Sequence, residues 1–267
     1  MIGVFDSGLG GLSVWQEIIR ILPDVPVIYA ADSGRCPYGS KPKEEIIRYS
    51  REMTQLLVDQ GCRLIVVACN TATAAAIRAL REEFDLPFVG MEPAIKPAAE
   101  ASKTGVVGIL ATEGTFRGQH FARAREQFAS NTHLIMQVGH GLVEWVESGQ
   151  LDGPEVEAGL RRYLEPMLAQ GADQIVLGCT HYPFLRPVME RIVAGKAIII
   201  DPAPAVAQQA LRLWEALPKG DQATSKQPYQ WFTSGDPDRM SNFLGQLGFP
   251  AAREAGAIRM VKEITHE

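Results

Sequence analysis

Leu64-Ile-Val-Val-Ala-Cys69-Asn70-Thr71 is an apolar run of strand length that ends at a cysteine, and Gln174-Ile-Val-Leu-Gly-Cys179-Thr180-His181 repeats it. Both runs are rich in β-branched residues, as is typical of parallel strands that are buried on both faces. In open α/β sheets, ligands bind at the carboxyl ends of such strands, where the next helix begins. We therefore expect Cys69 and Cys179 to contribute to one site from two halves of the chain.

The composition indicates a globular protein that acts on a small molecule. The chain has 267 residues, enough for one large or two medium domains, with 46% hydrophobic and 21% charged residues and a net charge of -5. A mildly acidic chain without long runs of Lys and Arg gives no electrostatic reason to expect nucleic acid or an anionic membrane as partner. A homodimer is left open by the sequence.

The first residues and the cysteines favour a cytoplasmic protein. No apolar run is long enough to span a bilayer, and Asp6 and Ser7 follow the short apolar start too soon for a signal peptide. In the cytoplasm the cysteines should be reduced thiols. None of them forms a C-x-x-C pair and the five histidines are scattered, so no structural zinc site is expected. The four cysteines are Cys36, Cys62, Cys69 and Cys179.

Strand-like runs recur at a constant offset along the chain. The cysteines are 179 − 69 = 110 positions apart, and the other expected strands keep a similar spacing. This repetition predicts two related α/β domains that face each other, followed by a tail without a counterpart. The strands are expected over 2–5, 27–30, 64–68 and 88–90, then over 105–110, 134–138, 175–178 and 197–200, with one more over 229–233. Helices are expected over 12–22, 44–60, 71–84, 206–217 and 238–247, with one more after Gly114-Thr115.

A glycine-rich turn, Asp6-Ser-Gly-Leu-Gly-Gly11, follows the first strand. It departs from the dinucleotide-binding pattern G-x-G-x-x-G because Ser13 stands where the last glycine is needed, so no dinucleotide cofactor is expected. Glycines in such a turn let the backbone approach a ligand, with Asp6 and Ser7 facing the crevice. The long loop 31–40 is also predicted to be functional.

Two thiols at matching strand ends suggest proton transfer. The positive end of a helix dipole favours a thiolate at each helix start, and neighbouring donors tune it further. Thiols from two facing domains would remove a proton from one face of a carbon and return one to the other, which inverts the carbon. A buried cysteine can instead be a small hydrophobic residue, as we expect for Cys62. Likewise, the polar residues after each cysteine can form a carboxylate-binding nest or only cap a helix.

Five motifs lie in order between Met1 and about Asp201: DSGLGG with the following Leu-Ser-Val, PYG at Pro37 to Gly39, ACNTAT at Ala68 to Thr73, GT at Gly114-Thr115 and GCTHYP at Gly178 to Pro183. Together they resemble the glutamate racemase family. This resemblance implies a cofactor-independent isomerase that interconverts L- and D-glutamate and supplies D-glutamate for peptidoglycan. It also implies two similar three-layer α/β domains with mainly parallel sheets related by pseudo-two-fold symmetry, residues 1–93 plus 207–267 and residues 94–206, with the active site in the cleft between them.

The same resemblance assigns roles to residues of this chain. Cys69 would take the α-proton of D-glutamate with help from Asp6, and Cys179 that of L-glutamate with help from His181 and a carboxylate of the second domain. The substrate-binding residues would be Asp6, Ser7, Pro37, Tyr38, Gly39, Asn70, Thr71, Thr115, Thr180 and His181.

The second-domain carboxylate is the point at which the chain departs from the family. The family has a Cys-Pro pair ahead of a Val-Glu-x-Gly element, whereas this chain has His140 in that region. Glu147 matches by its neighbours Val146 and Gly149 and is preferred, although Glu144 lies one helical turn earlier on a similar face.

Other functions fit parts of the pattern. A related racemase acting on aspartate or a hydantoin would need the same two thiols. A hydrolase with Cys179 as nucleophile and His181 as base leaves Cys69 unexplained. A binding module for an amino acid would use the site without proton exchange.

Overall fold

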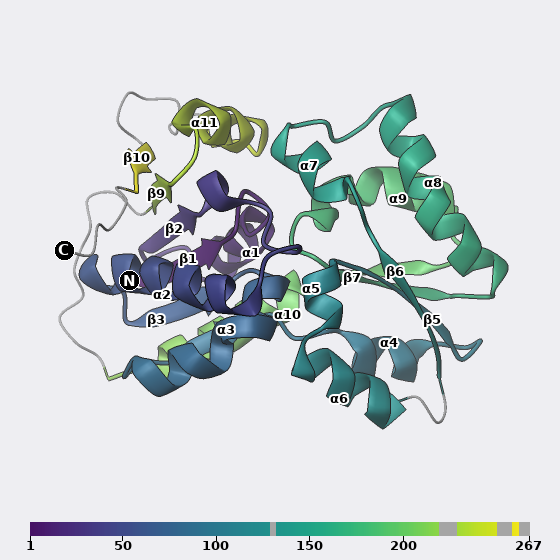
Figure 1. The fold of residues 1–267 in the computed structure, drawn as a ribbon, viewed down its shortest axis with the longest axis horizontal. Helices are drawn as coiled ribbons and strands as arrows, with labels where there is room; N and C mark the ends of the chain where they lie inside the picture. The colour runs from purple at the N-terminus through teal and green to yellow at the C-terminus, as the bar shows by residue number, and fades with distance from the viewer. Residues whose placement is uncertain (129–131, 219–228, 250–257, 262–267) are drawn as a thin grey trace.

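The chain folds into two parallel sheets, each flanked by helices. The computed structural model describes residues 1–128, 132–218, 229–249 and 258–261. Figure 1 shows the first sheet on the left, in purple and blue with two yellow strands from the end of the chain, and the second on the right, in teal and green. The predicted architecture of two similar α/β units is confirmed.

The first sheet is centred on β1. Its strand order is β10-β9-β2-β1-β3-β4, and every described pair is parallel. Because β1 lies between β2 and β3, the carboxyl ends of β1 and β3 are neighbours. The strands are β1 (Ile2–Asp6), β2 (Val27–Ala31), β3 (Leu64–Val67), β4 (Phe88–Gly90), β9 (Tyr229–Thr233) and β10 (Ile258–Met260).

The second sheet repeats the first. Its order β6-β5-β7-β8 is the order β2-β1-β3-β4 shifted by four strands, and all its pairs are parallel. The repetition seen in the sequence is therefore a repetition of topology. The strands are β5 (Val106–Ala111), β6 (His133–Val138), β7 (Gln174–Gly178) and β8 (Ile198–Ile200).

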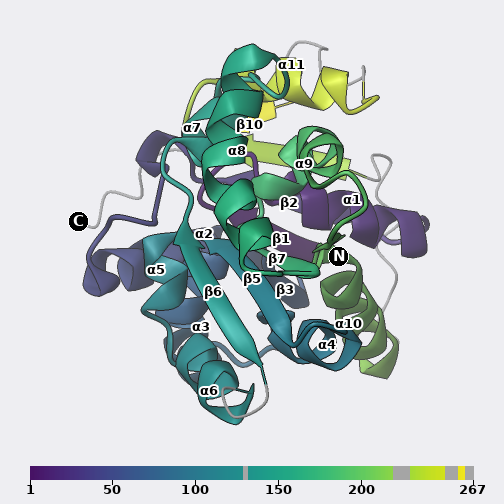
Figure 2. The ribbon, with the colours of Figure 1, turned by 90° about the vertical axis from the view of Figure 1, so that its right-hand side faces the viewer.

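Helices cover both faces of each sheet. Around the first sheet, α1 packs against α10 and α2 against α3; around the second, α8 packs against α9 and α4 against α6. Figure 2 shows α8 and α9 above the second sheet and α4 and α6 below it. The helices around the first sheet are α1 (Leu12–Ile21), α2 (Lys43–Asp59), α3 (Asn70–Glu83), α10 (Ala203–Ala216) and α11 (Pro237–Gln246). Those around the second are α4 (Ile95–Ala101), α5 (Glu113–Phe116), α6 (Gln119–Phe128), α7 (Leu142–Glu147), α8 (Pro154–Ala169) and α9 (Arg186–Val193).

One apolar core runs through both halves. The buried cluster that contains Trp15 of α1 and Ala207 of α10 also contains Leu160 of α8 and Met189 of α9. Burying such side chains is favourable by about 1.5–3 kcal/mol each. The halves are therefore joined by packing as well as by the two chain crossings between them.

Some expected boundaries were wrong. The helix expected from residue 206 begins at Ala203, with Pro202 and Pro204 at its start, where proline is tolerated. The expected helix after Gly114-Thr115 is broken into α5 and α6. No helix begins directly after Cys179, where a short 3₁₀ turn, η2 (Tyr182–Leu185), precedes α9. The helices α4 and α8 were not predicted, whereas α7 carries Glu144 and Glu147 one turn apart, as expected.

The C-terminal tail extends the first sheet. Its strand β9 pairs with β2, and the rings of Tyr229 and Trp231 pack against Trp15 of α1. Because α10 also packs on α1, this helix belongs to the first half. The predicted domain boundary at residue 207 falls inside α10. Residues 219–228, 250–257 and 262–267 of the predicted first domain lie outside the described residues.

None of the helices in the described ranges is both long enough and apolar enough to cross a membrane.

Candidate active site

Three strand ends meet where the two sheets face each other. Asp6 ends β1, Cys69 follows β3 and Cys179 follows β7. Both thiols line one small cavity, so the structure brings together the two cysteines that the sequence paired. The cavity is lined by Ser7, Pro37, Tyr38, Gly39, Cys69, Asn70, Thr71, Thr112, Val143, Cys179, Thr180 and His181.

Cys69 is a buried thiol at the start of a helix. It is the N-cap of α3, and its sulfur accepts a hydrogen bond from the Ala72 backbone N–H at 3.4 Å. Its thiol lies 3.7 Å from the Ser7 hydroxyl. Burial and the charge of Asp6 raise the pKa of Cys69 well above its ordinary value, against the opposing hydrogen bond from Ala72. This shift favours the thiol over the thiolate in the resting site.

Asp6 is fully buried beside this thiol. Its carboxylate accepts a hydrogen bond from the Gly11 N–H at 2.7 Å, and longer contacts come from the hydroxyls of Ser7 at 3.4 Å and Thr180 at 3.5 Å. Burial raises its pKa, while the charge of His181 opposes the shift. A buried carboxylate whose pKa is raised can accept a proton or pair with a cation, and either task would serve the neighbouring thiol or a bound ligand.

Cys179 lies next to a histidine instead of a helix start. Its sulfur is 3.7 Å from Nδ1 of His181. The backbone after Cys179 forms i→i+3 hydrogen bonds, from Tyr182 to Cys179 and from Phe184 to His181. Pro183 and Pro187 remove two N–H groups from this segment, so an α-helix cannot start at the cysteine. The expected helix dipole is absent at this thiol.

His181 and Glu147 form a buried ion pair behind Cys179. Nε2 of His181 lies 2.6 Å from Oε1 of Glu147, and the same oxygen accepts the Leu9 N–H at 2.7 Å. Burial lowers the pKa of His181, but Cys179, Cys36 and Glu147 outweigh it and the pKa is raised well above its ordinary value. Burial tends to raise the pKa of Glu147, yet His181 lowers it overall. Glu144 is exposed on α7, so Glu147 is the carboxylate at the histidine.

The glycine-rich turn of the first half packs on this ion pair of the second half. A Cβ at Gly8 would overlap the Glu147 carboxylate, and one at Gly10 would overlap the His181 ring. Gly10 N–H lies 3.3 Å from Nε2 of His181, a longer contact than that from Glu147. The glycines are therefore required for contact between the halves, a role that differs from the predicted approach of backbone to ligand.

The other predicted binding residues differ in position. Tyr38 lines the cavity, but its hydroxyl donates to Asp32. Asn70 also lines it, and its side-chain oxygen is buried without a hydrogen-bond partner among the residues that the structure describes. Thr115 lies outside this cavity and lines a neighbouring one together with Asn70, and its hydroxyl donates to the Gly178 carbonyl. Thr112, which follows β5 as Ser7 follows β1, lines the cavity and was not predicted.

The cavity is closed down. Its volume of about 10 Å³ is at most the space of one water molecule, far less than an amino acid requires. One of its walls joins the two halves through a 2.8 Å hydrogen bond between the hydroxyls of Thr71 and Thr112. Glutamate-sized ligands can enter only if the halves separate or the lining side chains move.

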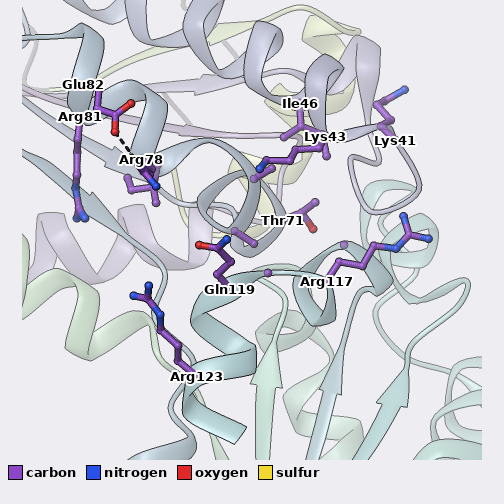
Figure 3. Close-up of a pocket in the computed structure, with 15 residues that line it drawn as sticks. Lys41, Lys43, Ile46, Thr71, Arg78, Arg81, Glu82, Arg117, Gln119 and Arg123 are labelled. Carbon is purple, nitrogen blue, oxygen red and sulfur yellow. Dashed lines mark hydrogen bonds and ion pairs between the residues drawn. The ribbon is translucent and has the colours of Figure 1, made fainter. Parts of the chain in front are cut away.

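A wider groove lies on the other side of this wall. It has a volume of about 510 Å³, and Thr71 lines both spaces. Figure 3 shows basic side chains on both walls, with Arg78 bonded to Glu82. Within the described residues, Lys43, Arg81 and Arg123 form no ion pair. The cations lining the groove are Lys41, Lys43, Arg78, Arg81, Arg117 and Arg123.

Cys36 adds a third type of ligand atom to the ion pair. The Cys36 sulfur, one nitrogen of His181 and one carboxylate oxygen of Glu147 all lie within 4.8 Å of one another. Burial raises the pKa of Cys36 to about 11. Cys62 lies elsewhere, in the core under α2, and burial raises its pKa to about 12.

Comparison with known proteins agrees with this geometry. The sequence profile of the family described as Asp/Glu/Hydantoin racemase matches residues 2–210. The chain belongs to this racemase family. A glutamate racemase of Herpetosiphon aurantiacus is 46% identical over 236 residues, which cover 88% of this chain and 93% of that protein.

Solved racemases of the family share the fold over nearly the whole chain. Escherichia coli glutamate racemase in complex with L-glutamate and activator UDP-MurNAc-ala has a TM-score of 0.84 and 33% identity, covering 97% of this chain and 96% of that one. Glutamate racemase isoform RacE1 from Bacillus anthracis has a TM-score of 0.83 and 31% identity, with 98% and 96% covered. The racemase fold therefore includes the tail that joins the first sheet.

Proposed function

We propose that this protein interconverts L- and D-glutamate without a cofactor, by moving the α-proton between Cys69 and Cys179, and supplies D-glutamate for peptidoglycan. The observation that carries the proposal is the single cavity lined by both thiols, one beside Asp6 and the other beside His181. Relatives named glutamate racemase at 46–47% identity support the choice of substrate.

Each direction uses one thiolate and one thiol. With L-glutamate, the Cys179 thiolate removes the α-proton and becomes a thiol, and the Cys69 thiol protonates the opposite face and becomes a thiolate. D-Glutamate reverses the steps. The next turnover needs the starting protonation state, which a proton exchanged through solvent or through Asp6 and His181 restores.

The neighbouring ionisable groups serve the two thiols differently. Protonated His181 stabilises a thiolate on Cys179 through Nδ1, while Glu147 holds the opposite ring nitrogen and keeps the imidazolium charged. Asp6 is the buried carboxylate whose charge acts on Cys69, and it would accept the thiol proton or hold the substrate ammonium group.

Substrate binding would use polar groups that line the cavity. The unpartnered oxygen of Asn70 is an acceptor suited to the α-ammonium group, because a buried acceptor without a partner is costly. The hydroxyls of Ser7, Thr71 and Thr180 can donate to the carboxylates. Closure around glutamate excludes water and strengthens these interactions, which the weakly acidic α-proton requires.

Isotope exchange tests the proposal. Dialysed enzyme incubated with L-glutamate in deuterium oxide should produce D-glutamate that carries deuterium at the α-carbon. Cys62→Ala serves as the matched control for cysteine variants, since Cys62 lies in the core away from the cavity. A folded enzyme that incorporated no deuterium would overturn the proposal, and faster exchange with aspartate would change the substrate.

One observation favours a second chemistry. Cys179, His181 and Glu147 form a chain of nucleophile, base and carboxylate, the order found in thiol hydrolases. A hydrolase would leave Cys69 without a task. Trapping an acyl group on Cys179 by mass spectrometry would support hydrolysis, and its absence during α-proton exchange would exclude it.

The basic groove is the place we propose for a regulatory ligand of the kind recorded with the Escherichia coli relative. That ligand carries a diphosphate, and the groove offers cations from both halves, including Lys43 of α2, Arg81 of α3 and Arg123 of α6. A ligand that binds cations of both halves would change how readily the halves separate. Titration with UDP-sugars should alter the rate, and Arg81→Gln should weaken that response; an unchanged response would place the ligand elsewhere.

The proposal extends to location and assembly. We expect a cytoplasmic enzyme with domains 1–93 plus 207–267 and 94–206, able to form homodimers. Sedimentation at several concentrations measures homodimer formation, and limited proteolysis tests the domain boundaries.

A further inference from the structure

We propose that Cys36, His181 and Glu147 form an inhibitory site for a borderline-soft divalent cation such as Zn²⁺. The spacing of cysteines and histidines in the sequence gave no zinc pattern, because these three residues are brought together only by the fold. They come from the loop after β2, from the segment after β7 and from α7. Their ligand atoms lie within 4.8 Å of one another.

The donor set suits zinc. One thiolate, one imidazole nitrogen and one carboxylate oxygen are its usual protein ligands, at about 2.0–2.3 Å, and three such ligands leave a fourth position for water. Tetrahedral binding at these lengths separates nitrogen and oxygen by about 3.3 Å. His181 Nε2 and Glu147 Oε1 are now 2.6 Å apart, so the pair must open by less than 1 Å.

An acidic pocket adjoins the proposed site at Glu147. Glu147 lies on the wall of a second pocket, of about 280 Å³, between α7 and α11. The same pocket is lined by Asp236 and Asp238, with Arg239 as its one basic residue among the described residues. Two further carboxylates raise the local concentration of cations next to the site.

Binding is balanced by loss of protons. The metal forms bonds to sulfur, nitrogen and oxygen, and the Cys36 thiol proton and one His181 proton pass to solvent. No electron is transferred. A bound metal withdraws His181 and Glu147 from Cys179, so racemisation should stop until a chelator removes it. Only this inhibitory consequence rests on the proposed function, because metal binding can be measured without turnover.

Cobalt provides a direct readout. The folded protein titrated with Co²⁺ should bind one ion per chain with a thiolate-to-cobalt absorption band, which Cys36→Ser should abolish. Cys62→Ser, the matched control, should keep the band. Loss of the band in Cys179→Ser with retention in Cys36→Ser would place the metal on the catalytic thiols and overturn the proposal, as would absence of binding.

Inhibition provides the second readout. Zn²⁺ should inhibit the wild type reversibly, with activity restored by EDTA, and Cys36→Ser should raise the half-inhibitory concentration at least about tenfold, as expected for loss of a ligand. Equal inhibition of the variant and wild type would contradict the proposal. If racemisation is absent altogether while the Cys36-dependent cobalt band is present, the metal site stands and the proposed function fails.

Discussion

The two thiols occupy matching places in two matching sheets, yet their surroundings differ. Cys69 caps an α-helix and lies beside Ser7, with Asp6 as its buried neighbour. Cys179 is followed by a 3₁₀ turn and lies beside His181, which Glu147 holds. A repeated strand order therefore fixes where the sulfurs are, and the residues after each strand decide how each is tuned.

This difference has a chemical consequence. A helix start and a carboxylate act on Cys69 in opposite directions, whereas the neighbour of Cys179 is an imidazole that Glu147 holds. Two distinct proton acceptors suit a substrate whose L- and D-enantiomers present the α-proton to opposite sides of the site.

The largest effect should come from removing either sulfur. Cys69→Ala and Cys179→Ala should each lower kcat at least about 10³-fold, because each direction needs both a base and an acid. Circular dichroism of glutamate measures the rate, with Cys62→Ala as control. Near-normal turnover in one cysteine variant alone would show that the two halves are not equivalent partners.

A smaller effect is expected at the ion pair of the second half. Glu147→Gln should lower kcat about 10²-fold, because His181 loses the charge that keeps it protonated. Glu144→Gln is the matched control one helical turn away and exposed, and it should behave as the wild type. Equal losses in the two variants would indicate an effect of α7 charge instead of a specific pair.

Contact between the halves gives a third prediction. Gly8→Ala should destabilise the fold by about 1–3 kcal/mol, because the new methyl group overlaps the Glu147 carboxylate. Thermal unfolding measures the cost. If Glu147 is its source, the cost should shrink in the background of Glu147→Ala; a cost that stays the same in both backgrounds would point to the turn itself.

Sequence patterns predicted the strands and the meeting of the cysteines because buried parallel strands are apolar runs with a local signature. Contacts between residues far apart in the sequence have no such local signature. The sequence around Leu9 does not predict that its N–H donates to Glu147, and the sequence around Cys36 does not predict that His181 lies beside it. Two signals were present in the sequence: Pro183 and Pro187 argue against a helix at Cys179, and aligning the repeats at the strand ends places Thr112 opposite Ser7.

The pH dependence of turnover sharpens the comparison from the side of Cys69. The pKa of this thiol is raised by burial and by Asp6, so below that pKa only a small fraction is thiolate. Removing the α-proton of D-glutamate requires the thiolate, so kcat/KM should rise about tenfold per pH unit up to a plateau above the ordinary thiol range, and should fall again where the partner thiol, which donates the second proton, is also deprotonated. The equilibrium constant of a racemisation is one, so kcat/KM for L-glutamate must follow the same profile. Asp6→Asn removes the neighbouring charge and should move the plateau to lower pH even though the rate falls. A wild-type plateau at neutral pH, unmoved by Asp6→Asn, would contradict this prediction. It would mean that substrate binding, and not the charge of Asp6 in the free enzyme, determines the protonation state of Cys69.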